Sequence, residues 1–295
     1  MLKGILTAVI TPMKAGTIDM DRLKPYLKWQ IEEGVDALVI GTATGEGHNL
    51  SYDELSSVIE CAKNCADDKA YVVATIHEAS LDQALAKVEI AEKAGADILL
   101  VAPLSHIPPG DAGQVAYYKA VSQLTTNPVF LYNDPYRFGV DVTVPLIQAI
   151  LAETDNVHGI IDASGDLSRS AFIRDAGGAG FWYLSGDDTT SLAALAMGAV
   201  GILSSTSNIA PGPMVDMFNL AKEDEFAQAL QYHDALMPLH WVLRSEVMPM
   251  PVKFAAYLLG ICEEESRPPL TELEKETKSL IAGAITQTGL EPVNF

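Results

Sequence analysis

The sequence predicts a closed (β/α)8 barrel followed by a C-terminal helical extension. Eight short apolar runs alternate with stretches of helical length, which is the order of elements that a parallel α/β protein requires. Eight such repeats favour closure into a TIM barrel over an open sheet. With 295 residues, 48% of them hydrophobic, the chain is long enough for one barrel with a full core.

The strands are expected where apolar residues cluster between turn residues. The eight predicted strands are residues 5–10, 37–40, 71–76, 98–102, 129–132, 157–161, 180–184 and 200–203. Amphipathic stretches between them predict the outer helices, for example residues 21–33, 52–66, 81–93 and 114–125. The turns GVDAL, GADIL and GAVGI each place a glycine before a strand, as a helix C-cap leading into a strand requires.

After residue 208 the pattern changes to helices without strands between them. The predicted helices are residues 213–221, 225–244, 252–259 and 271–288. Prolines mark where these helices must stop, at Pro249, Pro251, Pro268 and Pro269. We therefore expect a barrel over residues 1–208 and a helical extension over residues 209–295 that packs on it.

The charge argues against two classes of partner. The formal net charge is −20, from 39 acidic and 19 basic residues, which disfavours nucleic acid and anionic membrane surfaces. No apolar run approaches the ~20 residues of a membrane span, and no basic-then-apolar leader precedes ILTAVITP, so a cytoplasmic protein is expected. We expect no metal, because no ligand spacing supports one, and no cofactor, because no Gly-x-Gly-x-x-Gly turn follows the first strand.

Polar residues concentrate where the predicted strands end, which is the working face of such a barrel. The segments concerned are GTATGEGH, LYNDPYRFG, LSGDD and SSTSN, together with Thr11, His77, Glu78, Ser105 and His106. The sixth strand is the exception, because it ends in Ile161, which has no proton to give, no lone pair and no charge.

Six motifs in order resemble those of the dihydrodipicolinate synthase and N-acetylneuraminate lyase family. They are TAVITPM near the N-terminus, TGEG, LYNDPYRFG, GDLSR, LSGDD, and PMPVK in the helical tail, and they span nearly the whole chain. The resemblance implies a homotetramer made of two tight dimers. It also implies a Schiff base between a lysine at the end of the sixth strand and the ketone of pyruvate or a related 2-oxo acid.

This chain departs from that family at the position of the lysine. Ile161 stands there, in GIIDASGDL, and a Schiff base needs an amine nucleophile. The family's proton relay is also reduced, since Ala43 replaces a hydroxyl residue and Leu104 and Ser105 replace a Tyr-Tyr pair, which leaves Tyr132. Loss of one general acid or base typically costs ~10²- to 10⁴-fold in rate, so ordinary aldolase turnover is not expected.

The family's carboxylate-binding residues are retained. The resemblance implies that Arg137 receives a substrate carboxylate, for which an arginine fork is suited, although a salt bridge at the barrel mouth is the alternative. The expected substrate-binding residues are Thr44, Gly45, Glu46, Arg137, Gly186 and Leu203. We therefore expect the partner to be a small carboxylate.

Histidine and carboxylate side chains occur where the family does not usually place them, at His48, His77, Glu78 and His106. They either supply acid-base chemistry at neutral pH or are exposed loop residues. On the first interpretation the candidate catalytic residues are Tyr132, His77 and His106.

Three functions fit these residues. The favoured one is a lyase-type enzyme, such as a dehydratase, hydratase, cyclase or decarboxylase, that uses non-covalent acid-base chemistry on a small carboxylate. The second is a non-catalytic binder or regulatory homologue. The third is a conventional pyruvate-dependent lyase with its lysine substituted, but Ala43 and Ser105 argue against it because one substitution would leave the relay intact.

Overall fold

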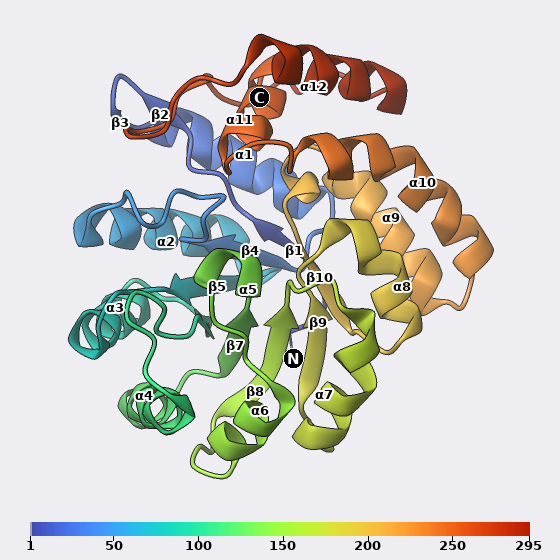
Figure 1. The fold of residues 1–295 in the computed structure, drawn as a ribbon. Coiled ribbons are helices and arrows are strands. Elements are labelled where there is room, and N and C mark those ends of the chain that lie inside the picture. The colour runs from blue at the N-terminus through green and yellow to red at the C-terminus, as the bar shows by residue number, and fades with distance from the viewer. Residues whose placement is uncertain (1) are drawn as a thin grey trace.

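The computed structural model of the chain describes residues 2–295 and shows the expected (β/α)8 barrel (Figure 1). Eight parallel strands close in the order β1-β10-β9-β8-β7-β6-β5-β4, with the helices around them and a C-terminal helical part beside the barrel. The strands are β1 (Gly4–Ala8), β4 (Ala37–Ile40), β5 (Tyr71–Ile76), β6 (Ile98–Val101), β7 (Val129–Asn133), β8 (Val157–Asp162), β9 (Trp182–Ser185) and β10 (Gly201–Ser204).

All eight barrel strands overlap the predicted ones, and β4 and β5 have the predicted bounds. Strand β1 ends two residues early because the Ile10 amide donates to the Asn208 side chain, at 2.9 Å, instead of to a neighbouring strand. A small antiparallel hairpin that the sequence did not predict follows it, formed by β2 (Met13–Lys14) and β3 (Thr17–Ile18).

The helices begin at the capping residues that the sequence supplies. Ser51 and Glu54 form a reciprocal capping box at the start of α2, which satisfies two backbone N–H groups. The helices are α1 (Met20–Glu32), α2 (Tyr52–Ala66), α3 (Leu81–Lys93), α4 (Asp111–Leu124), α5 (Pro135–Phe138), α6 (Val144–Leu151), α7 (Ser170–Gly177), α8 (Ser191–Ala196), α9 (Pro211–Lys222), α10 (Phe226–Val242), α11 (Met250–Leu258) and α12 (Lys275–Thr288). Short 3-10 turns follow three strands, η1 (Leu167–Arg169), η2 (Asp188–Thr190) and η3 (Thr206–Asn208).

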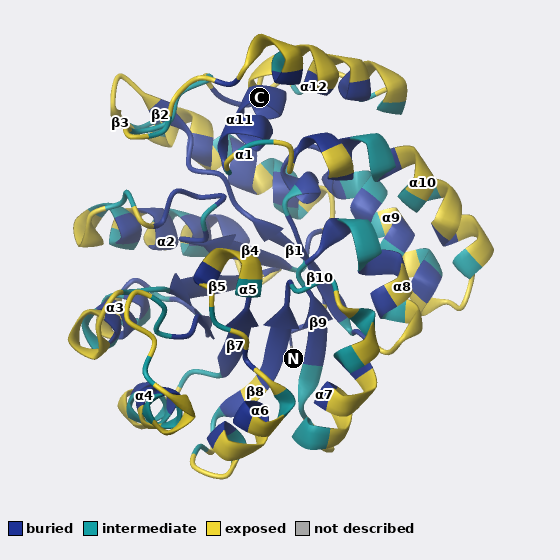
Figure 2. Ribbon diagram, in the orientation of Figure 1, coloured by how far each residue is buried: buried dark blue, intermediate teal, exposed yellow. Residues whose placement is uncertain are grey.

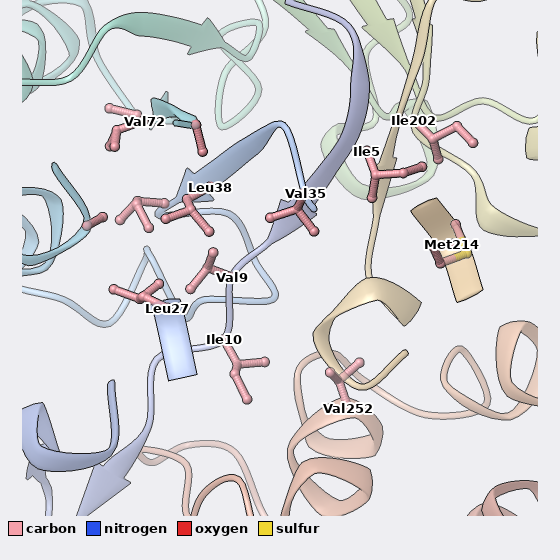
Figure 3. Close-up of a cluster of buried hydrophobic side chains, with 14 of the residues drawn as sticks. Ile5, Val9, Ile10, Leu27, Val35, Leu38, Val72, Ile202, Met214 and Val252 are labelled. Carbon is pink, nitrogen blue, oxygen red and sulfur yellow. The ribbon is translucent and has the colours of Figure 1, made fainter. Parts of the chain in front are cut away.

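The buried side chains form two separate layers. The larger fills the space between strands and helices; Figure 3 shows part of it, including Leu27 and Leu38. The smaller fills the barrel interior, and Ile161 belongs to it. Figure 2 shows the consequence, with buried strands at the centre and exposed residues on the outer faces of the helices. No helix within residues 2–295 combines the length and apolar character needed to cross a bilayer.

The C-terminal helices form a connected group. Helix α10 packs against both α9 and α12, and α11 packs against α12. Helix α9 also packs against β1, so it continues the ring of barrel helices. The division at residues 208 and 209 stays a prediction.

Candidate functional site

A cavity of about 340 Å³ lies at the carboxyl ends of the barrel strands. One part of its wall comes from the barrel and its loops: Ala8, Ala43, Thr44, Tyr132, Asp134, Tyr136, Arg137, Ala163, Gly186, Asp187, Asp188, Leu203 and Ser205. The other part comes from the end of α10 and the loop after it: His240, Leu243, Arg244, Glu246, Val247 and Met248. The C-terminal segment therefore closes one side of the barrel mouth.

Five of the predicted site residues line this cavity, namely Thr44, Tyr132, Arg137, Gly186 and Leu203. Tyr132 is buried, with its ring against that of Phe138 at a centroid distance of 5.2 Å. Burial is the main cause that raises the pKa of Tyr132, and the nearby Asp134 carboxylate raises it further. The phenol is therefore a neutral hydrogen-bond donor at physiological pH.

Arg137 is positioned by the short helix α5. Asp134 caps this helix by accepting from the Arg137 amide at 3.1 Å, and its other carboxylate oxygen accepts from Arg137 Nε at 2.9 Å. Within residues 2–295, neither terminal guanidinium nitrogen of Arg137 has a hydrogen-bond partner. Arg137 thus forms a salt bridge with Asp134 at the barrel mouth, which was one of the two expected roles. Its two terminal nitrogens are left to bind an anion.

A second arginine at the cavity was not predicted. Arg244 is half-exposed, and its Nη1 pairs with Asp187, whose carboxylate also accepts from the hydroxyls of Thr189 and Thr190 at 2.9–3.0 Å. The sequence placed Arg244 at the end of a helix in the extension, with nothing to show that this helix ends at the barrel mouth. Its only sequence signal is a basic residue shortly before the PMPVK motif.

Gly45 and Glu46 shape the loop behind the cavity wall and are not among the described residues that line the cavity. A side chain at Gly45 would lie 2.6 Å from the Val9 carbonyl oxygen, so only glycine fits there. Glu46 is fully buried, paired with Lys253, and accepts from the Arg267 amide at 3.0 Å. A substrate-binding role for these two residues stays a prediction.

A second cavity, of about 210 Å³, adjoins the first and shares Ala43, Arg137, Val247 and Met248 with it. His77, His48 and Lys87 line it, and Lys87 is buried in an ion pair with Glu78 at 2.8 Å. His77 Nε2 lies 3.3 Å from Ser105 Oγ. Burial is the main cause that lowers the pKa of His77, and the positive charge of Lys87 lowers it further. The ring is therefore neutral at physiological pH.

The three candidate catalytic residues do not come together at one point. Tyr132 lines the main cavity and His77 the adjoining one. His106 is exposed in the loop between β6 and α4 and lines neither cavity. The catalytic roles of all three stay predictions.

Ile161 points into the barrel. It is fully buried in the same interior cluster as Tyr132, Ala163 and Leu203, all of which line the main cavity. Strand pairing sets Ile161 beside Tyr132, in register with it. No lysine within residues 2–295 lines the main cavity.

The closed barrel and the cavity at the carboxyl ends of its strands define a (β/α)8-barrel protein with its candidate site on the face where such barrels usually place it. The chain belongs to the Dihydrodipicolinate synthetase family, whose profile matches residues 1–288. This confirms the family expected from the six motifs.

Relatives match along almost the full chain. The 4-hydroxy-tetrahydrodipicolinate synthases of Rhodospirillum centenum and Ruegeria pomeroyi are each 37% identical over 290 residues, covering 98% of this chain and 99% and 100% of theirs. The dihydrodipicolinate synthase structure from Aquifex aeolicus superposes with a TM-score of 0.95 at 31% identity, covering 99% of this chain and 100% of that one. The Acinetobacter baumannii enzyme complexed with pyruvate superposes with a TM-score of 0.94 at 31% identity, covering 98% and 100%.

Proposed function

We propose that this protein binds a small 2-oxo-acid-like carboxylate in the main cavity and acts on it as a lyase-type enzyme through non-covalent acid-base chemistry. The observation that carries the proposal is Ile161, a fully buried hydrocarbon in the interior cluster, three members of which, Tyr132, Ala163 and Leu203, line the main cavity. In the family that the six motifs resemble, this position holds the amine that captures a ketone.

Within residues 2–295, no lysine lines the main cavity to replace the missing amine. Lys253 is buried, but it donates to the Glu46 carboxylate and to the Glu265 carbonyl, the latter at 2.7 Å. Lys87 is held by Glu78 at the adjoining cavity. Each ammonium group is held by a carboxylate, and neither lysine is among the described residues that line the main cavity.

The carboxylate-binding part of the proposal is supported by two arginines. Arg137 and Arg244 both line the main cavity, beside the carboxylates of Asp134, Asp187, Asp188 and Glu246. Each is anchored through part of its guanidinium to one aspartate. The remaining N–H groups can bind a planar anion, and the related Acinetobacter baumannii structure contains pyruvate.

The alternative is a non-catalytic binder or regulatory homologue. Ala43 at the cavity wall favours this alternative, because the family has a hydroxyl residue at that position. The neighbouring hydroxyl, Thr44 Oγ1, makes one long contact, at 3.4 Å, with Ser205 Oγ. A conventional pyruvate-dependent lyase would need an amine at the cavity, which the described residues do not provide. We also propose that the protein is cytoplasmic and that it forms a homo-oligomer, either a dimer or a tetramer. Light scattering after gel filtration would measure the mass of the oligomer.

Borohydride trapping tests the chemistry. The protein is incubated with pyruvate and sodium borohydride and its intact mass is measured, with Ile161→Lys as the matched variant that restores an amine. We expect no adduct on the natural chain. An adduct on the natural chain would overturn the proposal, and the modified residue would then be located by peptide mapping.

Calorimetry with pyruvate and a panel of small 2-oxo and hydroxy acids tests binding. We expect Arg137→Ala to weaken pyruvate affinity about 10- to 100-fold, since a hydrogen bond to a charged group contributes ~1.5–3 kcal/mol. Arg22→Ala, on the exposed face of α1, is the control and should leave the affinity unchanged. Turnover of any ligand that binds supports the enzyme, whereas binding without turnover across the panel supports the non-catalytic alternative.

A further inference from the structure

Three buried side chains form a hydrogen-bonded chain at the wall of the main cavity. Asp188 follows β9, Thr206 follows β10, and His240 lies in the last turn of α10. Their exposed fractions are 8%, 0% and 1%. Thr206 Oγ1 lies 3.2 Å from Asp188 Oδ2 and 2.8 Å from His240 Nδ1, and both Asp188 and His240 line the cavity.

The chemistry of these groups fixes the direction of both hydrogen bonds. A carboxylate can only accept, so the Thr206 hydroxyl donates its single proton to Asp188. The Thr206 oxygen must then accept from His240, whose Nδ1 carries the ring proton. In the neutral ring Nε2 is therefore the unprotonated nitrogen, with a free lone pair.

The surroundings leave that lone pair without a partner. His240 Nε2 is buried and has no hydrogen-bond partner within residues 2–295. The Asp188 carboxylate is already held by the backbone amides of Ser205 and Thr206, at 3.0 and 3.1 Å, so Thr206 is positioned from both its backbone and its side chain. A rigidly oriented base with an empty acceptor site is an arrangement that suits proton abstraction.

Charges around the ring come from two directions. Asp187 and Asp188 lie on the barrel side and favour the protonated ring, whereas His233, with its ring centroid 5.8 Å away on the same helix, disfavours it. Burial is the largest influence and lowers the pKa of His240. Arg244 and Glu246 also line this cavity.

We propose that His240 is a general base of this site, and that Thr206 and Asp188 are positioning residues that fix its tautomer. On abstraction, the bond between a bound acid's carbon or oxygen and its hydrogen breaks, the proton goes to Nε2, and the electron pair remains on the ligand. The resulting imidazolium keeps its Nδ1–H on Thr206 and is stabilised by the Asp188 charge. The inference rests on the proposed function only for the presence of a carboxylate ligand.

Nitrogen NMR tests the tautomer without any turnover assay. The chain has six histidines, so ¹⁵N-histidine labelling gives few signals, and His240→Gln assigns the one of interest. We expect His240 near pH 7 to be neutral with the proton on Nδ1. Thr206→Val should reduce that preference roughly fivefold to tenfold, the factor expected for one net hydrogen bond, whereas Thr206→Ser should retain it.

Pyruvate is the probe for the role as base, with calorimetry recording its binding in the same samples. We expect saturating pyruvate to shift the His240 Nε2 resonance and to leave that of exposed His106 unchanged. A proton on Nε2 in the natural chain, or a tautomer that Thr206→Val does not change, would overturn the assignment. Pyruvate that binds by calorimetry without moving Nε2 would overturn the role as base, whereas absence of pyruvate binding would contradict the proposed ligand instead.

Discussion

Replacing Lys253 with methionine removes the cation from a fully buried ion pair. Lys253 and Glu46 are 1% and 0% exposed, and the pair joins α11 to the loop after β4. Methionine keeps the apolar stem but leaves the Glu46 carboxylate with two donors only, the Arg267 backbone amide at 3.0 Å and the Asn49 side-chain amide at 3.5 Å. Removing one partner of a buried pair costs about 3–5 kcal/mol, because the other charge stays buried without compensation.

That cost converts into a measurable melting shift. At ~2.1 cal/mol/K per residue, the unfolding entropy of the 295-residue chain is about 0.6 kcal/mol/K, so Lys253→Met should lower Tm by about 5–8 °C. Differential scanning calorimetry at pH 7 measures this, with exposed Lys275→Met as the control. The double variant Lys253→Met/Glu46→Gln should recover part of the loss, because glutamine carries no charge.

A drop in Tm below about 2 °C for Lys253→Met would refute the reasoning, since it would mean that Glu46 is solvated or neutral in the folded protein. A double variant that melts at or below the single variant would refute it too. If instead Lys253→Met behaves as expected, the loop after β4 is held by a residue that lies 207 positions after Glu46 in the chain.

Three further outcomes follow from named residues. The Arg267 guanidinium holds the pKa of Glu54 at about 2, against an ordinary 4.5. The ionised Glu54 therefore contributes stability above pH 4.5, and this contribution is lost as the pH falls towards 2. The difference in unfolding free energy between the natural chain and Glu54→Gln should shrink over that range. Burial lowers the pKa of His77 from 6.5, so the unfolded chain takes up this proton first and stability falls as the pH drops below 6.5; denaturant titrations should show a weaker fall for His77→Gln. Ile161→Lys should be less stable than Ile161→Met at pH 7, and the gap should narrow as the pH rises towards 10, because burial depresses the pKa of an unpaired lysine.

The barrel could be predicted because its signals are local. Alternation of apolar strands with amphipathic helices is encoded within each repeat, and α2 and α3, like β4 and β5, have their predicted bounds. The β2–β3 hairpin was missed because its strands are two residues long, too short to show a period. The family resemblance, together with the expected strand ends, pointed to Thr44, Tyr132, Arg137, Gly186 and Leu203, and these residues do line the cavity.

The rest of the site depends on contacts between distant segments. His240 and Arg244 belong to a predicted helix whose sequence does not show that its end lies over the barrel mouth. Lys87 fell on an outer helix by the sequence pattern, yet it is buried at the adjoining cavity with Glu78. Periodicity assigns a face of a helix, but it does not say which neighbour that face meets.

Two adjacent carboxylates after β9, those of Asp187 and Asp188, hold the part of the cavity wall that comes from the end of α10 and the loop after it. Asp187 binds Arg244, and Asp188 binds Thr206, which binds His240. The turn after β9 thus holds Arg244 directly and His240 through Thr206, and these two residues come from the end of α10 and the loop after it. The C-terminal segment therefore adds Arg244 and His240 to a cavity to which the barrel side contributes Arg137. On the two proposals made above, the acid binds between Arg137 and Arg244 and its proton moves to His240, so that the chemistry needs no amine at the end of β8.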